Sequence, residues 1–190
     1  MNSNTNTPPE DDFEKLAAGA LAYPELKLRW SAEWKTSVAI RESIETFFAK
    51  QGLSTREISK SPPEISGFSL SISHSPVGGV WAAVALPQKI GVDLEKQSRV
   101  TEPIVRRVSE DHEIQDSPEP SFLWSAKEAV FKSCWPENQG IPLSKAVIDS
   151  WQSIGQSQFR FTARWKGHPL LGRGWAAIRD ESLCSVFLHI

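Results

Sequence analysis

Residues 90–95 read Ile-Gly-Val-Asp-Leu-Glu, and much of what the sequence predicts about the fold depends on this stretch. Side chains two residues apart share one face of a β-strand, so Asp93 and Glu95 are expected to point the same way. The apolar residues of the stretch then face the opposite side: Ile90, Val92 and Leu94. The sequence therefore predicts a strand that buries one face and presents two carboxylates on the other.

A second stretch, residues 124–132, reads Trp-Ser-Ala-Lys-Glu-Ala-Val-Phe-Lys and is typical of a helix. Glu128 and Lys132 are four residues apart and so lie one turn apart on the same helix face. The opposite face carries an apolar stripe at helical spacing, made of Leu123, Ala126, Val130 and Cys134. If the strand face and the helix face meet, three carboxylates surround one point with an ammonium beside it. Oxygen ligands of this kind suit Mg²⁺ holding a phosphate ester.

Composition excludes several classes of function. The chain has 190 residues, enough for one domain or for two small fused lobes. Its net charge of −2 gives no sign of a nucleic-acid partner, and its two cysteines are too few for a disulfide framework. No apolar run approaches the roughly 20 residues of a membrane helix, and the N-terminus lacks an apolar signal core. We therefore expect a soluble, cytoplasmic protein that uses neither nucleic acid nor membrane.

The region before the carboxylate strand predicts a helix and two strands. Residues 31–51 have the period of an amphipathic helix, with Gly52 as its end. Residues 68–74 alternate apolar side chains with serines, which predicts a half-buried strand ending at His74. Residues 80–86 are almost wholly apolar and predict a central strand covered on both faces. The short connection that follows favours a hairpin, which would place all three strands in one sheet.

The remaining segments are assigned more coarsely. Residues 1–12 are polar and acidic and predict a disordered tail. Residues 102–113 are predicted to include a short helix carrying Arg106 and Arg107, and residues 121–132 show the clearest helix pattern of the chain. The part after that helix reads as two or three antiparallel strands. The tryptophans are expected to be mainly large core residues with a polar handle.

Three blocks of the sequence together resemble a known enzyme family. They are the pair Ser73-His74 at the end of a strand, the Gly-x-Asp-x-Glu pattern of residues 91–95, and the Trp-Ser-x-Lys-Glu-Ala-x-x-Lys pattern of residues 124–132. In order, spacing and identity they are similar to the 4'-phosphopantetheinyl transferases, specifically the larger surfactin-synthetase-activating type. The resemblance is strong over residues 60–150 and weak elsewhere.

This resemblance implies an α+β fold built as a pseudo-dimer of two similar lobes, each a small antiparallel sheet packed with a helix. After the tail of residues 1–12, the N-terminal lobe would span residues 13–87. The C-terminal lobe, with the metal site, would span residues 88–190. Coenzyme A would lie in the cleft between the lobes, and a chain that contains both lobes is expected to be a monomer.

The activity implied is transfer of 4'-phosphopantetheine from coenzyme A to a serine hydroxyl of an apo acyl or peptidyl carrier protein, which releases 3',5'-ADP. Mg²⁺ would be held by Asp93, Glu95 and Glu128, and Lys132 would stabilise the pyrophosphate in the transition state while contacting coenzyme A. Glu128 is also the first candidate for the general base. The further coenzyme contacts implied by the resemblance are Lys60, Ser73, His74 and Lys127.

The chain departs from the family pattern in two places. It is shorter than the usual members, mainly before Lys60, and residues 134–140 replace a Gly-rich turn. Several cations are available for the 3'-phosphate and nothing in the sequence chooses among them: Arg29, Lys35 and Arg41. Glu113 lies near the position of a family glutamate, and Arg106 with Arg107 could dock an acidic carrier helix or form a solvated helix face.

Each motif also has an ordinary reading. A carboxylate pair on a strand is commonly a solvated face, and Glu128 with Lys132 is commonly a surface ion pair. Their joint occurrence in family order favours the transferase. Two alternatives stay open: a non-catalytic module of the same fold that binds carrier protein or coenzyme A, and an unrelated Mg²⁺-dependent nucleotide hydrolase. The sequence does not indicate which carrier is modified, whether acyl-coenzyme A is accepted, or whether Mn²⁺ replaces Mg²⁺.

Overall fold

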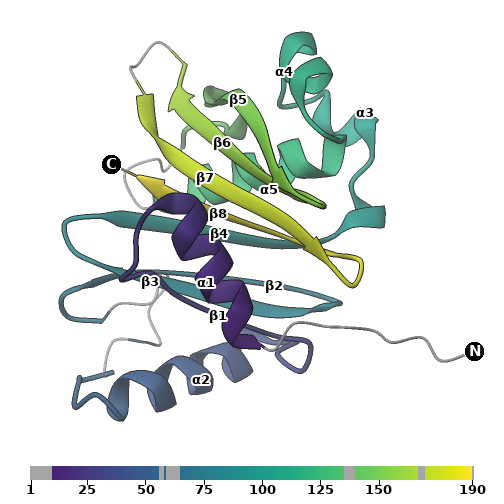
Figure 1. Cartoon of the computed structure of the whole chain (residues 1–190). Coiled ribbons are helices and arrows are strands. Elements are labelled where there is room, and N and C mark those ends of the chain that lie inside the picture. The colour runs from purple at the N-terminus through teal and green to yellow at the C-terminus, as the bar shows by residue number, and fades with distance from the viewer. Residues whose placement is uncertain (1–9, 56–57, 59–64, 135–139, 167–169, 190) are drawn as a thin grey trace, which may run out of the picture.

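The computed structural model describes residues 10–55, 58, 65–134, 140–166 and 170–189, which form an α+β protein with two antiparallel sheets (Figure 1). The fold class predicted from the sequence is confirmed. The small sheet has the order β1-β3-β2 and contains β1 (Lys27–Ser31), β2 (Phe68–Ser75) and β3 (Gly78–Ala85). The large sheet has the order β4-β8-β7-β6-β5 and contains β4 (Lys89–Lys96), β5 (Ala146–Gly155), β6 (Gln158–Trp165), β7 (Leu170–Arg179) and β8 (Ser182–His189).

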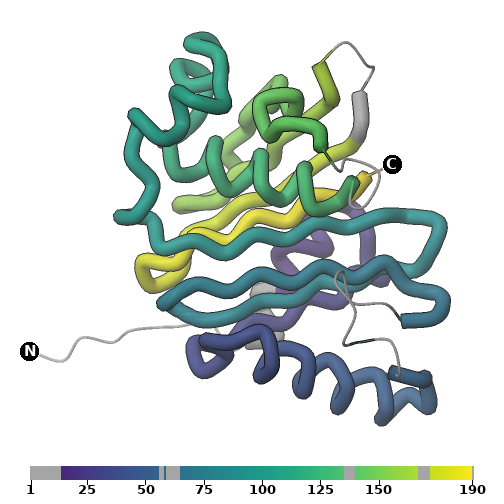
Figure 2. Tube along the Cα trace, turned by 180° about the vertical axis from the view of Figure 1, so that it is seen from behind, coloured from purple at the N-terminus to yellow at the C-terminus, as the bar shows by residue number. Residues whose placement is uncertain are grey.

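Three helices cover the faces of these sheets. Helix α1 (Glu10–Leu21) lies in front of the large sheet in Figure 1 and contacts both β1 and β7. Helix α2 (Ser37–Ala49) packs on the small sheet; it begins after Thr36, whose hydroxyl accepts a hydrogen bond from the backbone N–H of Ala39. Helix α5 (Pro120–Ser133) crosses the far face of the large sheet, as the view from behind shows (Figure 2).

Short helices complete the C-terminal half. They are the 3₁₀ turns η1 (Gln97–Arg99) and η2 (Leu143–Lys145) and the helices α3 (Glu102–Val105) and α4 (Asp111–Asp116). The short helix predicted within residues 102–113 is α3, but Arg106 caps its end and Arg107 follows it; a second short helix, α4, begins at Asp111. No helix among the described residues is both long and apolar enough to cross a membrane.

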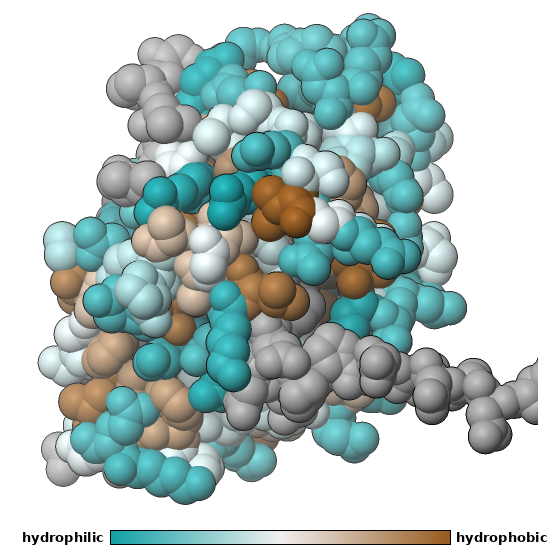
Figure 3. All heavy atoms as spheres, in the orientation of Figure 1, coloured by the Kyte–Doolittle hydropathy of each residue, from teal (hydrophilic) through white to brown (hydrophobic). Residues whose placement is uncertain are grey.

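Two apolar clusters cover the two faces of β3, which was predicted to be a central strand. Val80, Ala82 and Val84 pack with α1, β4, β7 and β8, whereas Trp81 and Ala83 pack with α2. A third cluster lies between α5 and the large sheet. Because the first cluster takes residues from both sheets, the two lobes share a core. The face that carries α1 is largely hydrophilic, with apolar residues scattered over it (Figure 3).

The prediction that β2, β3 and β4 share one sheet is wrong. Strand β3 is already paired with β1 on one edge and β2 on the other, so it has no free edge for β4. Strand β4 instead pairs with β8, from Lys89 opposite His189 to Lys96 opposite Ser182. The short connection between β3 and β4 therefore joins two sheets and is not a hairpin within one.

Serine side chains of β2 close the open edge of β4. The hydroxyls of Ser69, Ser71 and Ser73 accept hydrogen bonds of 3.1, 3.0 and 3.2 Å from backbone N–H groups of alternate β4 residues. The donors, in the same order, are Ile90, Val92 and Leu94. An uncovered strand edge exposes such N–H groups to water or to other chains. The serines that alternate along β2 thus form a ladder that joins the two lobes.

Several predicted boundaries shift. Helix α1 begins at Glu10, so the predicted tail is wrong over residues 10–12, and residues 1–9 lie outside the described part. The predicted lobe boundary after residue 87 falls in the connection between β3 and β4. Among the described residues the lobes are less alike than expected, with three strands against five, and the part after α5 has four strands where two or three were predicted.

Candidate functional site

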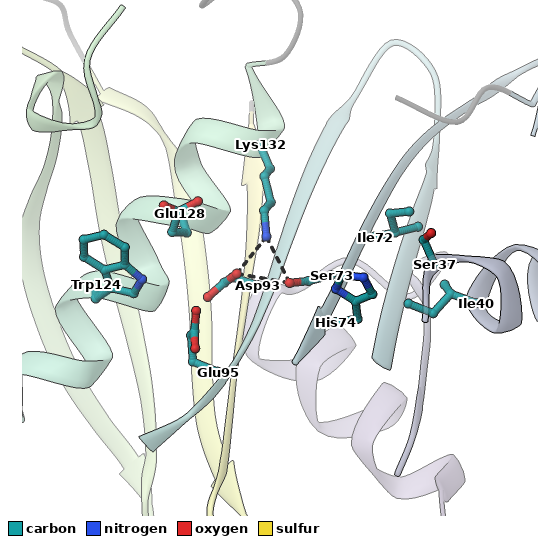
Figure 4. Close-up of a pocket in the computed structure, with 10 residues that line it drawn as sticks. All are labelled: Ser37, Ile40, Ile72, Ser73, His74, Asp93, Glu95, Trp124, Glu128 and Lys132. Carbon is teal, nitrogen blue, oxygen red and sulfur yellow. Dashed lines mark hydrogen bonds and ion pairs between the residues drawn. The ribbon is translucent and has the colours of Figure 1, made fainter. Parts of the chain in front are cut away.

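The three motif blocks line one pocket of about 360 Å³ at the junction between the lobes (Figure 4). Strand β2, strand β4, helix α5 and the start of helix α2 each contribute side chains. The lining residues are Ser37, Ile40, Ile72, Ser73, His74, Asp93, Glu95, Trp124, Glu128 and Lys132. The expected meeting of the strand face with the helix face is therefore found in the structure.

Gly91 explains why α5 approaches β4 so closely. A Cβ atom built at Gly91 would lie 1.8 Å from the backbone oxygen of Ala129 and 2.6 Å from the backbone nitrogen of Ser133. No side chain fits there, so the glycine lets the helix backbone lie directly on the strand. Because residues two apart share a strand face, Asp93 and Glu95 point to the same side as Gly91, toward the helix.

Asp93 and Lys132 form the central contact of the pocket. Asp93 is only 3% exposed, and its Oδ1 atom lies 2.7 Å from Lys132 Nζ. The hydroxyl of Ser73 donates to the same Oδ1 at 3.1 Å, and Lys132 donates to the Ser73 hydroxyl at 3.0 Å. The other oxygen, Asp93 Oδ2, is buried and accepts no hydrogen bond from the described residues. One carboxylate oxygen in the pocket thus has capacity left for a ligand.

The two glutamates of the pocket are held in an unfavourable environment for charge. Burial raises the pKa of the Glu95 carboxyl, and the nearby Asp93 carboxylate raises it further. Burial is also the main cause that raises the pKa of Glu128, followed again by repulsion from Asp93. Lys132 opposes both effects but does not cancel them. A cation in the pocket would relieve this repulsion.

The residues of the pocket fit Mg²⁺ in chemistry, although they are not drawn together around one point. Within the described part of the chain, no group of three or more acidic, histidine or cysteine side chains has the spacing of a metal site. The donors are nevertheless carboxylate oxygens, one of which is buried without a partner among the described residues, and the pKa values of both glutamates are raised by burial and by repulsion from Asp93. Carboxylates of this kind, with water and phosphate oxygens, are what Mg²⁺ binds.

His74 is exposed at the end of β2 and lines the pocket on the small-sheet side, near Ser37 and Ile40 (Figure 4). It is placed to meet a ligand that enters from solvent. The contribution of α2, through Ser37 and Ile40, was missed by sequence reasoning. No local pattern in residues 37–40 indicates a site; only the packing of α2 on the small sheet brings them there.

Lys127, which the resemblance placed among the coenzyme A contacts, does not line this pocket. Its side chain is fully buried, with Nζ 2.7 Å from Glu113 Oε1, and it also donates to the backbone oxygen of Ala146. Burial lowers the pKa of the Lys127 ammonium, and the Glu113 carboxylate opposes that effect. The cause is helical geometry, since one residue along a helix turns the side chain by about 100° away from Glu128.

Other predicted contacts lie elsewhere or cannot be placed. Lys60 falls outside the described residues. Arg29 forms an ion pair with Glu14 and lies over the Phe47 ring, 5.3 Å from its centroid, so it is engaged at the β1 edge of the small sheet, whereas the pocket is lined from the β2 edge. Arg106 pairs with two acids on the exposed surface of the C-terminal lobe, which matches the solvated helix face: Glu102 and Asp111.

Comparison with known proteins adds no family assignment, because no protein-family model and no curated protein sequence matches the chain. The fold and the pocket define an α+β protein with two antiparallel sheets and an acidic, lysine-bearing pocket where the sheets meet.

Proposed function

We propose that this protein is a Mg²⁺-dependent 4'-phosphopantetheinyl transferase that moves phosphopantetheine from coenzyme A to a serine of an apo carrier protein. One observation carries the proposal. The three blocks that resemble the family are separated by up to 59 positions in the chain, yet they line the same pocket. Motif residues that resembled the family by chance would have no reason to converge in space.

The proposed roles follow from the chemistry of the pocket. Asp93, Glu95 and Glu128 would hold Mg²⁺, whose charge would offset that of the pyrophosphate when coenzyme A is bound. Lys132 projects between β2 and β4 and would stabilise charge on the phosphate oxygens as the bond to the leaving group breaks. His74, at the exposed edge, would contact a phosphate of coenzyme A.

The transfer is a substitution at phosphorus. The serine oxygen of the carrier forms a bond to the β-phosphorus of coenzyme A, and the bond from that phosphorus to the bridging oxygen breaks, which releases 3',5'-ADP. Glu128 is the candidate acceptor for the serine proton. Its raised pKa makes it a stronger base than an ordinary glutamate, provided that it is ionised when the serine arrives.

The proposed partners are coenzyme A and an apo acyl or peptidyl carrier protein, met in the cytoplasm where both would be available. The pocket takes residues from both sheets of a single chain, so catalysis by a monomer is proposed. The non-catalytic module remains the second candidate and makes a distinct prediction, namely coenzyme A binding without transfer.

Intact-protein mass spectrometry tests the proposal directly. A panel of apo carrier proteins is incubated with the protein, coenzyme A and Mg²⁺, with EDTA in a parallel reaction. The proposal expects a mass increase of one phosphopantetheine group on at least one carrier, and no increase with EDTA. Coenzyme A binding measured by calorimetry, combined with no mass increase on any carrier, would support the non-catalytic module.

A further inference from the structure

The hydroxyl of Ser73 has no hydrogen-bonding capacity left for a coenzyme phosphate. It accepts from the backbone N–H of Leu94 at 3.2 Å and from Lys132 Nζ at 3.0 Å, and it donates to Asp93 Oδ1 at 3.1 Å. A serine hydroxyl has one proton and two acceptor lone pairs, and all three are used here. A new partner would have to displace one of these contacts.

The other two serines of the ladder are engaged differently. Ser69 and Ser71 accept from β4 backbone N–H groups just as Ser73 does. Within the described part of the chain, their hydroxyls form no hydrogen bond to a charged side chain. Ser71 is also buried, two residues from Ser73 on the same strand face. The serine ladder between the lobes thus repeats one contact three times, and of its three serines only Ser73 lines the pocket.

We propose that Ser73 is a positioning residue whose hydroxyl holds Lys132 and Asp93 in place where the two lobes meet, and that it is not a ligand for coenzyme A. This inference rests on the proposed function for its catalytic consequence. Lys132 comes from α5 in the C-terminal lobe, whereas Ser73 comes from β2 in the N-terminal lobe. The position of the Lys132 ammonium therefore depends on how the two lobes are joined.

The reason for such a contact is the length of the lysine side chain. Four rotatable bonds give the ammonium many positions, and ordering it costs conformational entropy. Asp93 alone restrains Lys132 at one point, while the Ser73 hydroxyl adds a second restraint from the opposite lobe. With the hydroxyl removed, the ammonium stays near Asp93 but loses its defined direction. A displacement of about 1 Å at a catalytic group can lower a rate by about 10²-fold.

The test compares Ser73→Ala with Ser71→Ala, which removes the same kind of contact to β4 without touching the pocket. The catalytic rate constant and the coenzyme A dissociation constant are measured for both, with Ser73→Thr as the conservative rescue. We expect Ser73→Ala to lower kcat by about 10- to 100-fold with an unchanged coenzyme A dissociation constant. Ser71→Ala should keep wild-type kcat, and Ser73→Thr should recover most of the lost rate.

Two outcomes of the kinetic arm would overturn the inference. If Ser73→Ala weakened coenzyme A binding and left kcat unchanged, Ser73 would be a ligand. If Ser71→Ala lowered kcat as much as Ser73→Ala, the effect would come from the serine ladder as a whole and not from the contact between Ser73 and Lys132. A wild-type protein that transfers nothing would contradict the proposed function, and the positioning role would then be decided by the second arm.

The second arm is a double-mutant cycle on unfolding by urea, which needs no activity. Ser73→Ala and Lys132→Met, alone and combined, are compared with the matched cycle of Ser71→Ala and Lys132→Met. Contacting residues give non-additive effects, whereas residues without contact add. We expect non-additivity in the first cycle and additivity in the second. Additivity in both cycles would overturn the positioning role whatever the protein transfers.

Discussion

Two acid–lysine pairs of the same length lie on opposite sides of α5. Glu113 pairs with Lys127 and Asp93 pairs with Lys132, each at 2.7 Å. The first pair is almost completely buried, and Glu113 also accepts from two backbone N–H groups, those of Ile148 and Glu110. In the second pair, Lys132 is 29% exposed and Asp93 Oδ2 is buried without a partner among the described residues.

The difference separates an ion pair enclosed in the core from one that a ligand can reach. In the Glu113–Lys127 pair the charges are out of reach of a ligand, and they tie α4, α5 and β5 together. In the Asp93–Lys132 pair, Asp93 Oδ2 has no partner among the described residues, and Asp93 lines a pocket together with Glu95 and Glu128. Buried polar groups normally have a hydrogen-bond partner, and a cation or water bound beside this pocket would supply one for Asp93 Oδ2.

The largest expected effect comes from breaking the buried pair. Lys127→Met leaves the Glu113 carboxylate buried without its cation, and it removes the donor to the Ala146 carbonyl. Removing one partner of a buried pair costs about 3–5 kcal/mol of unfolding free energy. Urea unfolding measures the loss. Lys132→Met is the matched control, because it makes the same change on the same helix at a pair whose lysine is 29% exposed. An equal loss there would remove the distinction between the pairs.

Breaking the pocket pair should act on the reaction instead. Lys132→Met is expected to lower kcat by about 10²–10³-fold, or about 2.7–4 kcal/mol of transition-state stabilisation, since it removes a charge aimed at the phosphate oxygens. The coenzyme A dissociation constant should change far less. Single-turnover kinetics and calorimetry separate the two effects. An unchanged rate with weakened binding would make Lys132 a binding residue only.

Asp93→Asn should abolish stabilisation by the metal. A ligand at about 100 times its dissociation constant stabilises a folded protein by about 2.7 kcal/mol, and the variant should lose most of this gain. Thermal unfolding with and without Mg²⁺ measures it. Asp111→Asn is the control, because Asp111 pairs with Arg106 on the exposed surface, away from the pocket. Equal Mg²⁺ stabilisation of wild type and Asp93→Asn would show that the metal is held without Asp93.

The smallest expected effect is a pH dependence of the metal response. The pKa values of Glu95 and Glu128 are raised, so both carboxyls hold protons more tightly in the folded chain than in the unfolded chain. Without Mg²⁺, their contribution to stability is therefore present at low pH. It is lost as pH rises from the ordinary carboxyl pKa through the raised values.

Mg²⁺ competes with these protons, so stabilisation by Mg²⁺ should grow over the same pH window, by about tenfold in affinity per pH unit for each proton displaced. Melting temperatures with and without Mg²⁺ at several pH values measure the effect. A Mg²⁺ response that is constant across this window would indicate carboxylates already ionised at its lower end.

Local spacing was enough to predict which side chains share a face. The two-residue spacing of Asp93 and Glu95 and the four-residue spacing of Glu128 and Lys132 follow from the geometry of one strand and one helix. All four line the same pocket. The apolar stripe of α5 was predicted for the same reason, and its residues are buried.

The same spacing argument did not reveal how Lys127 and the ladder serines are used. Lys127 belongs to the motif by sequence, yet its side chain meets Glu113 on a separate helix, α4. The serines of β2 read as the solvated face of a strand, and in the structure they cover the edge of β4. Both outcomes depend on partners more than ten residues away, which no local pattern specifies.

The sequence by itself determined the secondary structure around the site and the direction in which its charged side chains point, because these depend on the backbone period alone. Only the tertiary structure decided which sheet β4 joins, since that depends on β1 and β2 having taken both edges of β3. It also decided that one lysine of α5 is structural and the other faces the pocket. Burial and the number of satisfied hydrogen bonds are properties of the packed chain, and they distinguish the two.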